Sequence, residues 1–136
     1  MNRTGIAAVA GVCAALALAG CSNRDAPQEK TAHAGNVQVT AGADGVQAVT
    51  LTGGDDLRFS PSTFHVHPGK VKITLRDGGT TPHDLTFTGK LHAEIPMTMH
   101  GQSNSMELTV RTPGRYPFEC ELHIQEKMTG TMIVDR

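Results

Sequence analysis

Four residues whose side chains bind soft metal ions lie in two separate parts of this 136-residue sequence. Cys120, His123 and Met128 form a Cys-x2-His-x4-Met array near the end, and His83 lies in the segment Thr-Pro-His-Asp-Leu-Thr-Phe. A thiolate, an imidazole and a thioether suit copper better than calcium or magnesium, which prefer oxygen ligands. A trigonal copper site needs a second imidazole, which His83 would supply, and a weakly bound axial Met. The alternative interpretation is a buried free Cys beside a surface His and a core Met.

This pattern resembles the cupredoxins, the small blue-copper proteins related to plastocyanin and azurin. The resemblance covers residues 46–136, and its most specific part is the four candidate ligands, followed by Gly130 and an apolar run. It implies one type 1 copper ion that alternates between Cu(I) and Cu(II). The implied copper ligands are His83, Cys120, His123 and Met128.

One residue departs from the family pattern. Many cupredoxins have Asn directly after the first His, and its amide supports the Cys sulfur, whereas this sequence has Asp84. A carboxylate cannot donate that hydrogen bond unless it is protonated. Asp84 is therefore a candidate for tuning the surroundings of the sulfur and the reduction potential.

The segments that must position the ligands have the alternating pattern of β-strands. Val71, Ile73 and Leu75 alternate with polar residues, which predicts a strand with one wet face. Because side chains repeat every two residues along a strand, His83 shares a face with Leu85 and Phe87, and Cys120 shares one with Tyr116 and Phe118. Seven or eight such runs, separated by Gly and Pro turns, predict an all-β fold, an antiparallel Greek-key β-sandwich.

The N-terminal region has the features of an export signal. Residues 1–20 combine an early Arg with an Ala-rich apolar stretch, and Leu-Ala-Gly-Cys21 resembles the lipobox of bacterial lipoproteins. The resemblance implies lipidation of Cys21, and an ordinary secretory signal is the alternative. The polar composition of residues 21–44 predicts a flexible tether, and residues 45–136 would form the copper-binding domain. Cys120 is then the one free thiol left, and metal ligation explains its retention in an oxidising compartment.

Composition and missing motifs exclude several functions. The formal net charge is −1 and there is no polybasic patch, which argues against nucleic-acid binding. A copper oxidase or nitrite reductase needs a second copper centre, and no second His-rich set of adequate size is present. Neither a Ser/His/Asp arrangement nor a phosphate-binding loop is evident. We therefore expect a binding protein rather than an enzyme.

Two further groups of candidate ligands remain. Met97, Met99 and His100 form a Met-x-Met-His segment that would suit Cu(I), or their methionines pack over the copper site. His65 and His67 share one strand face and are expected to be exposed polar residues, since a pair supplies only half of a four-ligand site.

These features favour an exported electron carrier, tethered through Cys21 to the extracytoplasmic (periplasmic or cell-surface) side of a membrane, with a membrane-associated redox protein as partner. We expect a monomer. The alternatives are an extracytoplasmic copper chaperone or buffer that delivers copper to a cuproenzyme, and a metal-free β-sandwich used in assembly.

Overall fold

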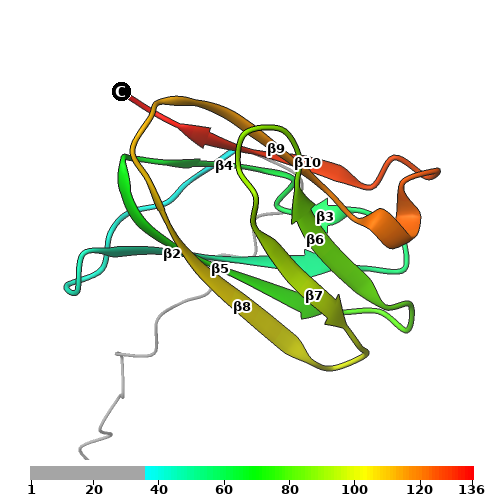
Figure 1. Cartoon of the computed structure of the whole chain (residues 1–136). Coiled ribbons are helices and arrows are strands. Elements are labelled where there is room, and N and C mark those ends of the chain that lie inside the picture. The colour runs from blue at the N-terminus through cyan, green and yellow to red at the C-terminus, as the bar shows by residue number, and fades with distance from the viewer. Residues whose placement is uncertain (1–35) are drawn as a thin grey trace, which may run out of the picture.

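A computed structural model describes residues 36–136, which form two β-sheets packed against each other (Figure 1). The six-stranded sheet has the spatial order β1 (Asn36–Gln38), β4 (Thr63–Val66), β10 (Thr129–Val134), β9 (Gly114–Glu119), β6 (His83–Phe87), β7 (Glu94–Thr98). The four-stranded sheet has the order β3 (Phe59–Ser60), β2 (Val46–Gly53), β5 (Gly69–Asp77), β8 (Ser103–Val110). One 3-10 helix, η1 (Glu121–His123), follows β9.

The expected alternation determines which strand faces are buried. In β5, Val71, Ile73 and Leu75 are fully buried, whereas the intervening Lys72, Thr74 and Arg76 are partly or fully exposed. In β6, His83, Leu85 and Phe87 are buried together. Both predicted strand faces therefore turn toward the space between the sheets, and His83 points into the core from the first residue of β6.

Four aromatic rings fill the middle of the core. The ring of Phe118 in β9 lies 5.2 Å from Phe59, 6.0 Å from Phe64 and 5.5 Å from Phe87, measured between ring centroids. A β-carbon at Gly130 in β10 would lie only 2.3 Å from Cζ of Phe118, so the ring packs directly over a position that has no side chain. This contact places the start of β10 close against the end of β9, which is where Cys120 follows.

The predicted all-β sandwich is confirmed, with two differences in detail. Ten strands are present in residues 36–136 instead of seven or eight, because the short β1 and β3 add to the longer runs. Three pairings are parallel, namely β1 with β4, β4 with β10, and β2 with β5. Both sheets therefore contain parallel as well as antiparallel pairs. The strands of each parallel pair are not consecutive along the chain, because a parallel pair needs a long connection between its strands.

The expected boundary of the tether was wrong for residues 36–44. Val37 and Val39 alternate with polar residues, β1 pairs with β4, and Val39 is buried in the core. The backbone of Val39 also donates a hydrogen bond to the carbonyl of His65, with 2.9 Å between nitrogen and oxygen. The sandwich therefore begins by Asn36. The predicted signal, Cys21 and the first part of the tether lie outside the described residues.

Among residues 36–136, no helix is long and apolar enough to cross a membrane.

Candidate metal centre

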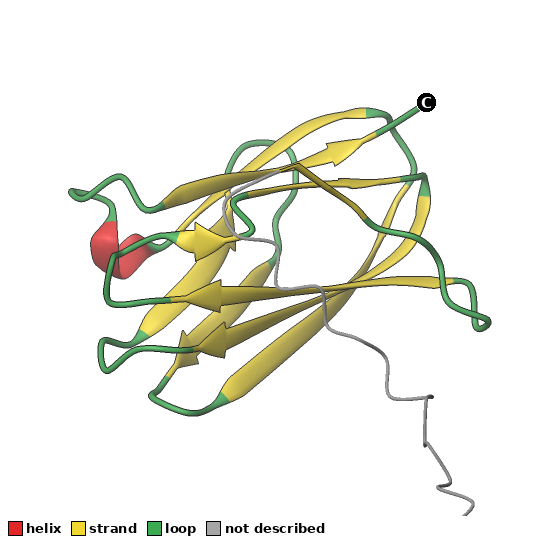
Figure 2. Cartoon of the chain, turned by 180° about the vertical axis from the view of Figure 1, so that it is seen from behind, coloured by secondary structure: helices red, strands yellow, loops and turns green. Residues whose placement is uncertain are grey.

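The candidate ligands come from strand ends that meet at one end of the sandwich. His83 is the first residue of β6, Cys120 directly follows β9, His123 ends η1, and Met128 directly precedes β10. β6 and β9 are neighbours in the sheet, with Phe87 opposite Phe118 and Thr86 opposite Glu119. Figure 2 shows the 3-10 helix, in red, at this end of the sandwich beside several loops.

Three of the predicted ligands form a compact cluster. One ligand atom from each of His83, Cys120 and His123 lies within 4.8 Å of the other two. Sγ of Cys120 is 3.3 Å from Nδ1 of His123, and the two imidazole centroids are 5.1 Å apart. This set, two imidazoles and one thiol, is the trigonal donor set of a type 1 copper site.

The loop that carries Cys120, His123 and Met128 is closed by its own backbone. The amide of Cys120 donates to the carbonyl of Met128 over 3.0 Å, and the amide of Met128 donates to the carbonyl of His123 over 3.3 Å. Met128 is fully buried, as are Cys120 and His83. The backbone bonds therefore bring the thioether residue next to the thiol residue, although seven residues separate them in the sequence.

The buried imidazole of His83 fits a metal ligand. Neither ring nitrogen makes a hydrogen bond of acceptable geometry with any residue between 36 and 136. A buried polar atom without a partner costs about 1–3 kcal/mol, so a core seldom keeps one without a reason. Burial also lowers the pKa of His83, which keeps the ring neutral and its lone pair available. A bound copper ion would give this lone pair its partner.

The thiol of Cys120 is held in its neutral form in the metal-free protein. Burial is the main cause that raises its pKa to about 11, and the Asp84 carboxylate contributes in the same direction. A metal that binds here must therefore displace the thiol proton. Within the described residues Cys120 is the only cysteine, and it forms no disulfide.

The position of His83 depends on residues that the sequence did not single out. A β-carbon at Gly53 would lie 2.6 Å from Cδ2 of His83, so this glycine leaves the space that the imidazole occupies. The carboxylate oxygen Oδ1 of Asp55 accepts hydrogen bonds from the amides of Thr80 and Thr81, over 2.7 and 3.0 Å. These bonds fix the loop that leads into β6. A Gly-Gly-Asp-Asp segment indicates only a turn, so no signal in the sequence identified either role.

Asp84 connects the two halves of the site. Its Oδ1 accepts a hydrogen bond from the amide of Glu121 over 2.7 Å, which ties β6 to the ligand loop. The carboxylate of Asp84 therefore accepts a hydrogen bond. The Asn side chain that many cupredoxins have at this position would instead donate one to the Cys sulfur. Asp84 in place of Asn thus puts a carboxylate beside Cys120.

The segment Met97–His100 lies outside the cluster of candidate ligands. Met97 and Met99 are 53% and 47% exposed, so about half of each side chain is open to solvent. The other two large apolar side chains exposed in the described part of the chain are Leu122 and Ile124, which flank His123. His65, expected to be merely exposed, is partly buried and pairs with Asp135 over 3.0 Å.

The donor set, its burial and the sandwich are features that this chain shares with known proteins. The family description "Cupredoxin-like domain" matches residues 10–134. This chain belongs to the cupredoxin family. The cluster of His83, Cys120, His123 and Met128 is accordingly typical of a type 1 copper site.

Known cupredoxins show similarity in both sequence and structure. "Plastocyanin A/B" of Petroselinum crispum is 34% identical over 93 residues, which cover 61% of this chain and 95% of that protein. "Plastocyanin, chloroplastic" of Hordeum vulgare is 30% identical over 123 residues, which cover 82% of this chain and 77% of that protein. The structure of auracyanin A from Chloroflexus aurantiacus superposes with a TM-score of 0.59 at 16% identity, covering 67% of this chain and all of that one.

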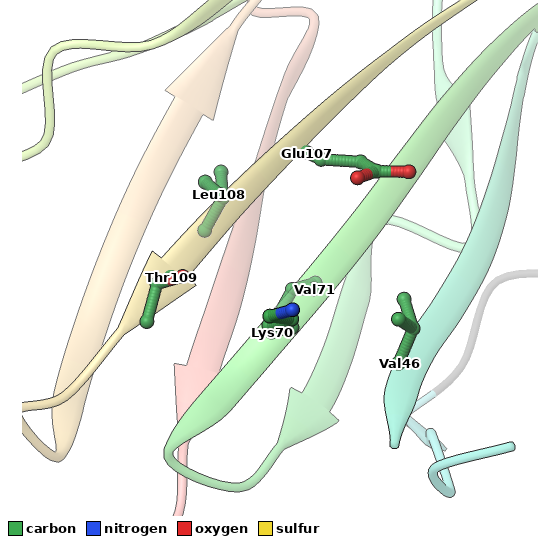
Figure 3. A pocket seen from close by; sticks show the side chains of 6 residues that line it. All are labelled: Val46, Lys70, Val71, Glu107, Leu108 and Thr109. Carbon is green, nitrogen blue, oxygen red and sulfur yellow. The ribbon is translucent and has the colours of Figure 1, made fainter. Parts of the chain in front are cut away.

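A shallow hollow on the four-stranded sheet is unrelated to the metal centre. Its volume is about 230 Å³, and Figure 3 shows the six side chains that line it, from β2, β5 and β8. Val46 and Lys70 lie near the starts of β2 and β5. Gly53, at the other end of β2, lies against the imidazole of His83. The hollow therefore lies at the opposite end of the sandwich and contains no soft metal ligand.

Proposed function

We propose that this protein is an exported, membrane-tethered electron carrier with one type 1 copper ion held by His83, Cys120, His123 and Met128. The observation that carries the proposal is the cluster of His83, Cys120 and His123 within 4.8 Å, in which the buried ring nitrogens of His83 have no hydrogen-bond partner among residues 36–136. Auracyanin A, a protein of similar fold, is described as a "blue" copper protein. Copper supplies a one-electron couple between Cu(I) and Cu(II).

Each ligand residue has a distinct task in this proposal. Cys120 provides a thiolate once its proton is displaced, and His83 and His123 each provide one imidazole nitrogen. Met128 provides the weak axial thioether from a fully buried position. Burial of His83, Cys120 and Met128 excludes water, and the surrounding hydrogen bonds hold the ligand residues in place before the metal binds. A centre that need not rearrange between oxidation states exchanges electrons with a small barrier.

His123 offers the route by which electrons enter and leave. It is only partly buried, unlike the other three ligands. Leu122 and Ile124, which flank it, are 48% and 46% exposed. A partner redox protein with an apolar contact surface would approach the copper most closely here. The role is therefore electron transfer between proteins rather than catalysis, with the chain acting as a monomer.

The visible spectrum tests the copper assignment. Adding Cu(II) to the purified metal-free protein should give an intense thiolate-to-copper band and a type 1 EPR signal. Cys120→Ser should abolish both, because a hydroxyl cannot replace the thiolate. A colourless wild-type complex would refute the proposal.

The lipobox-like segment ending at Cys21 supports the membrane tether. Acyl chains contribute about 0.8 kcal/mol for each buried CH₂ group, so two or three chains anchor a protein stably. Expression in a bacterial host should place the protein in the membrane fraction with a lipid-modified Cys21, detected by mass spectrometry. Cys21→Ala should release it from the membrane. Membrane association that survives this substitution would argue against the anchor.

Copper delivery is a second candidate function. The exposure of Met97 and Met99 favours it, because two half-exposed thioethers beside a copper centre are available to bind copper in transit. The two functions differ in copper stoichiometry. An electron carrier binds one copper ion that is reversibly oxidised and reduced, whereas a delivery protein binds an additional Cu(I) ion that it can release.

A further inference from the structure

Met97, Met99 and His100 combine soft donor atoms with an exposed position. Met97 and Met99 lie on either side of Thr98, which is fully buried, whereas the two methionines are 53% and 47% exposed. Residues 36–136 contain five methionines, of which Met128 and Met132 are fully buried and Met106 is partly buried. Met97 and Met99 are therefore the two methionines of the described residues whose thioether side chains are most accessible to solvent.

The backbone beneath these side chains is held in place. The side-chain nitrogen of Asn104 in β8 donates to the carbonyl of Met97 over 3.3 Å and to Oγ1 of Thr98 over 3.2 Å. The amide of Gln102 donates to the carbonyl of Met99 over 2.9 Å, which closes the turn. The two methionines thus have a fixed backbone and free side chains, an arrangement that presents donor atoms without ordering the chain first.

His100 has one ring nitrogen available for a metal. Its Nδ1 makes a hydrogen bond with the carbonyl of Gly79. A carbonyl oxygen only accepts, so Nδ1 carries the proton and Nε2 keeps its lone pair. Metal-binding histidines are commonly held in this way, with the second nitrogen donating to a carbonyl or carboxylate. His100 is exposed, so Nε2 is open to a ligand.

This segment lies beside the strand that carries His83. Thr98, between the two methionines, is the direct partner of His83 in the pairing of β7 with β6. Gly79, which accepts from His100, belongs to the loop that leads to His83. The backbone between the two methionines therefore lies one strand spacing, about 5 Å, from the backbone of His83.

From this arrangement we propose that Met97, Met99 and His100 form a second copper site, a surface site for Cu(I) that loads the type 1 centre. Thioethers are soft, neutral ligands that select Cu(I) over Zn²⁺ and Cu(II). Binding through two sulfurs and a neutral imidazole changes no oxidation state and releases no proton. Loading would replace the bonds from the sulfurs of Met97 and Met99 and from Nε2 of His100 by bonds from the type 1 ligands, and Cys120 would release its thiol proton to solvent as its Sγ binds. The loading role rests on the proposed type 1 centre, whereas the binding site does not.

A Cu(I) titration tests the site directly. Protein whose type 1 centre is already filled and reduced is titrated without oxygen with the coloured Cu(I) complex of bicinchoninate, and copper transfer is followed as loss of colour. Wild type should take up a second Cu(I). The double variant Met97→Leu/Met99→Leu should bind it at least ten times more weakly, and His100→Gln should also weaken it. Met106→Leu, a partly buried methionine in β8, is the matched control and should bind as wild type does.

The leucine substitutions separate metal binding from protein docking. Leucine keeps the apolar surface and nearly the volume of methionine but has no sulfur. If the methionines serve only as an apolar docking surface, the double variant binds the second Cu(I) as wild type does, and the proposal fails. It also fails if wild type takes up no second Cu(I).

Methyl NMR gives a readout at individual residues. With ¹³C-labelled methionine methyl groups, the second Cu(I) should shift the signals of Met97 and Met99 and leave those of Met106 and Met132 in place. Shifts confined to other methionines would overturn the assignment.

The loading role and the type 1 centre can fail separately. In wild type, metal-free protein given limiting Cu(I) and then oxidised should develop the thiolate band several times faster than the double leucine variant does. Equal rates would refute loading. A comparison of Cys120→Ser with Cys120→Ser/Met97→Leu/Met99→Leu tests the surface site where no thiolate band can form. The first variant should keep the surface Cu(I), and the second should lose it.

Discussion

The Asp84 carboxylate accepts a hydrogen bond from the amide of Glu121, with 2.7 Å between Oδ1 and nitrogen, and so links the strand that begins with His83 to the loop that begins with Cys120. The bond joins two segments that are 37 positions apart in the sequence. It also fixes a negative charge next to the sulfur, since this carboxylate contributes to the raised pKa of Cys120, after the larger effect of burial. One side chain therefore affects both the geometry and the electrostatics of the centre.

Replacing Asp84 by Asn should raise the reduction potential of the copper-loaded protein. A negative charge stabilises the more positive Cu(II) state, so its removal favours Cu(I). The amide oxygen can still accept from Glu121, which keeps the loop in place. We expect an increase on the order of tens of millivolts, where about 59 mV corresponds to a tenfold change for a one-electron couple. Voltammetry measures the shift, and Asp56→Asn is the control because Asp56 is exposed. An unchanged or lower potential would contradict the electrostatic role of Asp84.

Gly53→Ala should disturb the copper site more than Gly54→Ala, the same substitution at its partly buried neighbour, does. The new β-carbon would lie 2.6 Å from Cδ2 of His83 and 2.8 Å from Cγ, so the imidazole must move. We expect a loss of about 1–3 kcal/mol in the free energy of unfolding, typical of overpacking, together with a shifted or weakened thiolate band. In Gly54→Ala the nearest contact is the flexible carboxylate of Asp56 at 3.0 Å. If both variants have the wild-type spectrum, the proposed constraint on His83 is absent.

The sequence could predict the ligands and their faces because both follow from local patterns. The period of two along a strand placed His83 with Leu85 and Cys120 with Phe118, and both pairs are buried together. The spacing within the final loop kept three donors near one another. These inferences needed no knowledge of which strands pair.

The supports of the site could not be predicted, because they depend on contacts between remote segments. Asp55 and Thr80 are 25 positions apart, and their hydrogen bond follows only from the folded position of two loops. Gly53 contacts His83 because β2 and β6, which lie in different sheets, approach each other at this end. β1 was missed as a firm element for the same reason, since a strand of three residues gains its stability from the partner β4.

Asp55 should make the stability of the metal-free protein dependent on acid pH. The hydrogen bonds from the amides of Thr80 and Thr81 lower the pKa of Asp55 below its ordinary value of 3.8. Because the folded-state pKa is depressed, this contribution is fully present above pH 3.8 and is lost as the pH falls through the lower folded-state value. Asp55→Ala should therefore destabilise the protein at neutral pH, and its difference from wild type should shrink below about pH 4.

Urea unfolding over a pH series measures this effect. Asp56→Ala serves as the control, since Asp56 is an exposed neighbour in the same turn and accepts none of these hydrogen bonds. We expect its difference from wild type to stay small at every pH. A gap between Asp55→Ala and wild type that persists undiminished into acid would show that the loss is one of packing rather than of the charged hydrogen bonds.

Replacing His83 by Leu should stabilise the metal-free protein while removing its response to copper. The buried ring has two nitrogens without a partner among the described residues, and an apolar side chain in this position removes their desolvation cost. We expect a gain of about 1–2 kcal/mol in the metal-free state. Copper binds only the folded protein, so at a free concentration 100 times the dissociation constant it should add about 2.7 kcal/mol to wild type and almost nothing to the variant. Thermal and urea unfolding with and without copper measure both effects. If His83→Leu is instead less stable than wild type without metal, the imidazole stabilises the core by itself. Its burial without a hydrogen-bond partner would then not be a cost that the protein bears in order to bind copper.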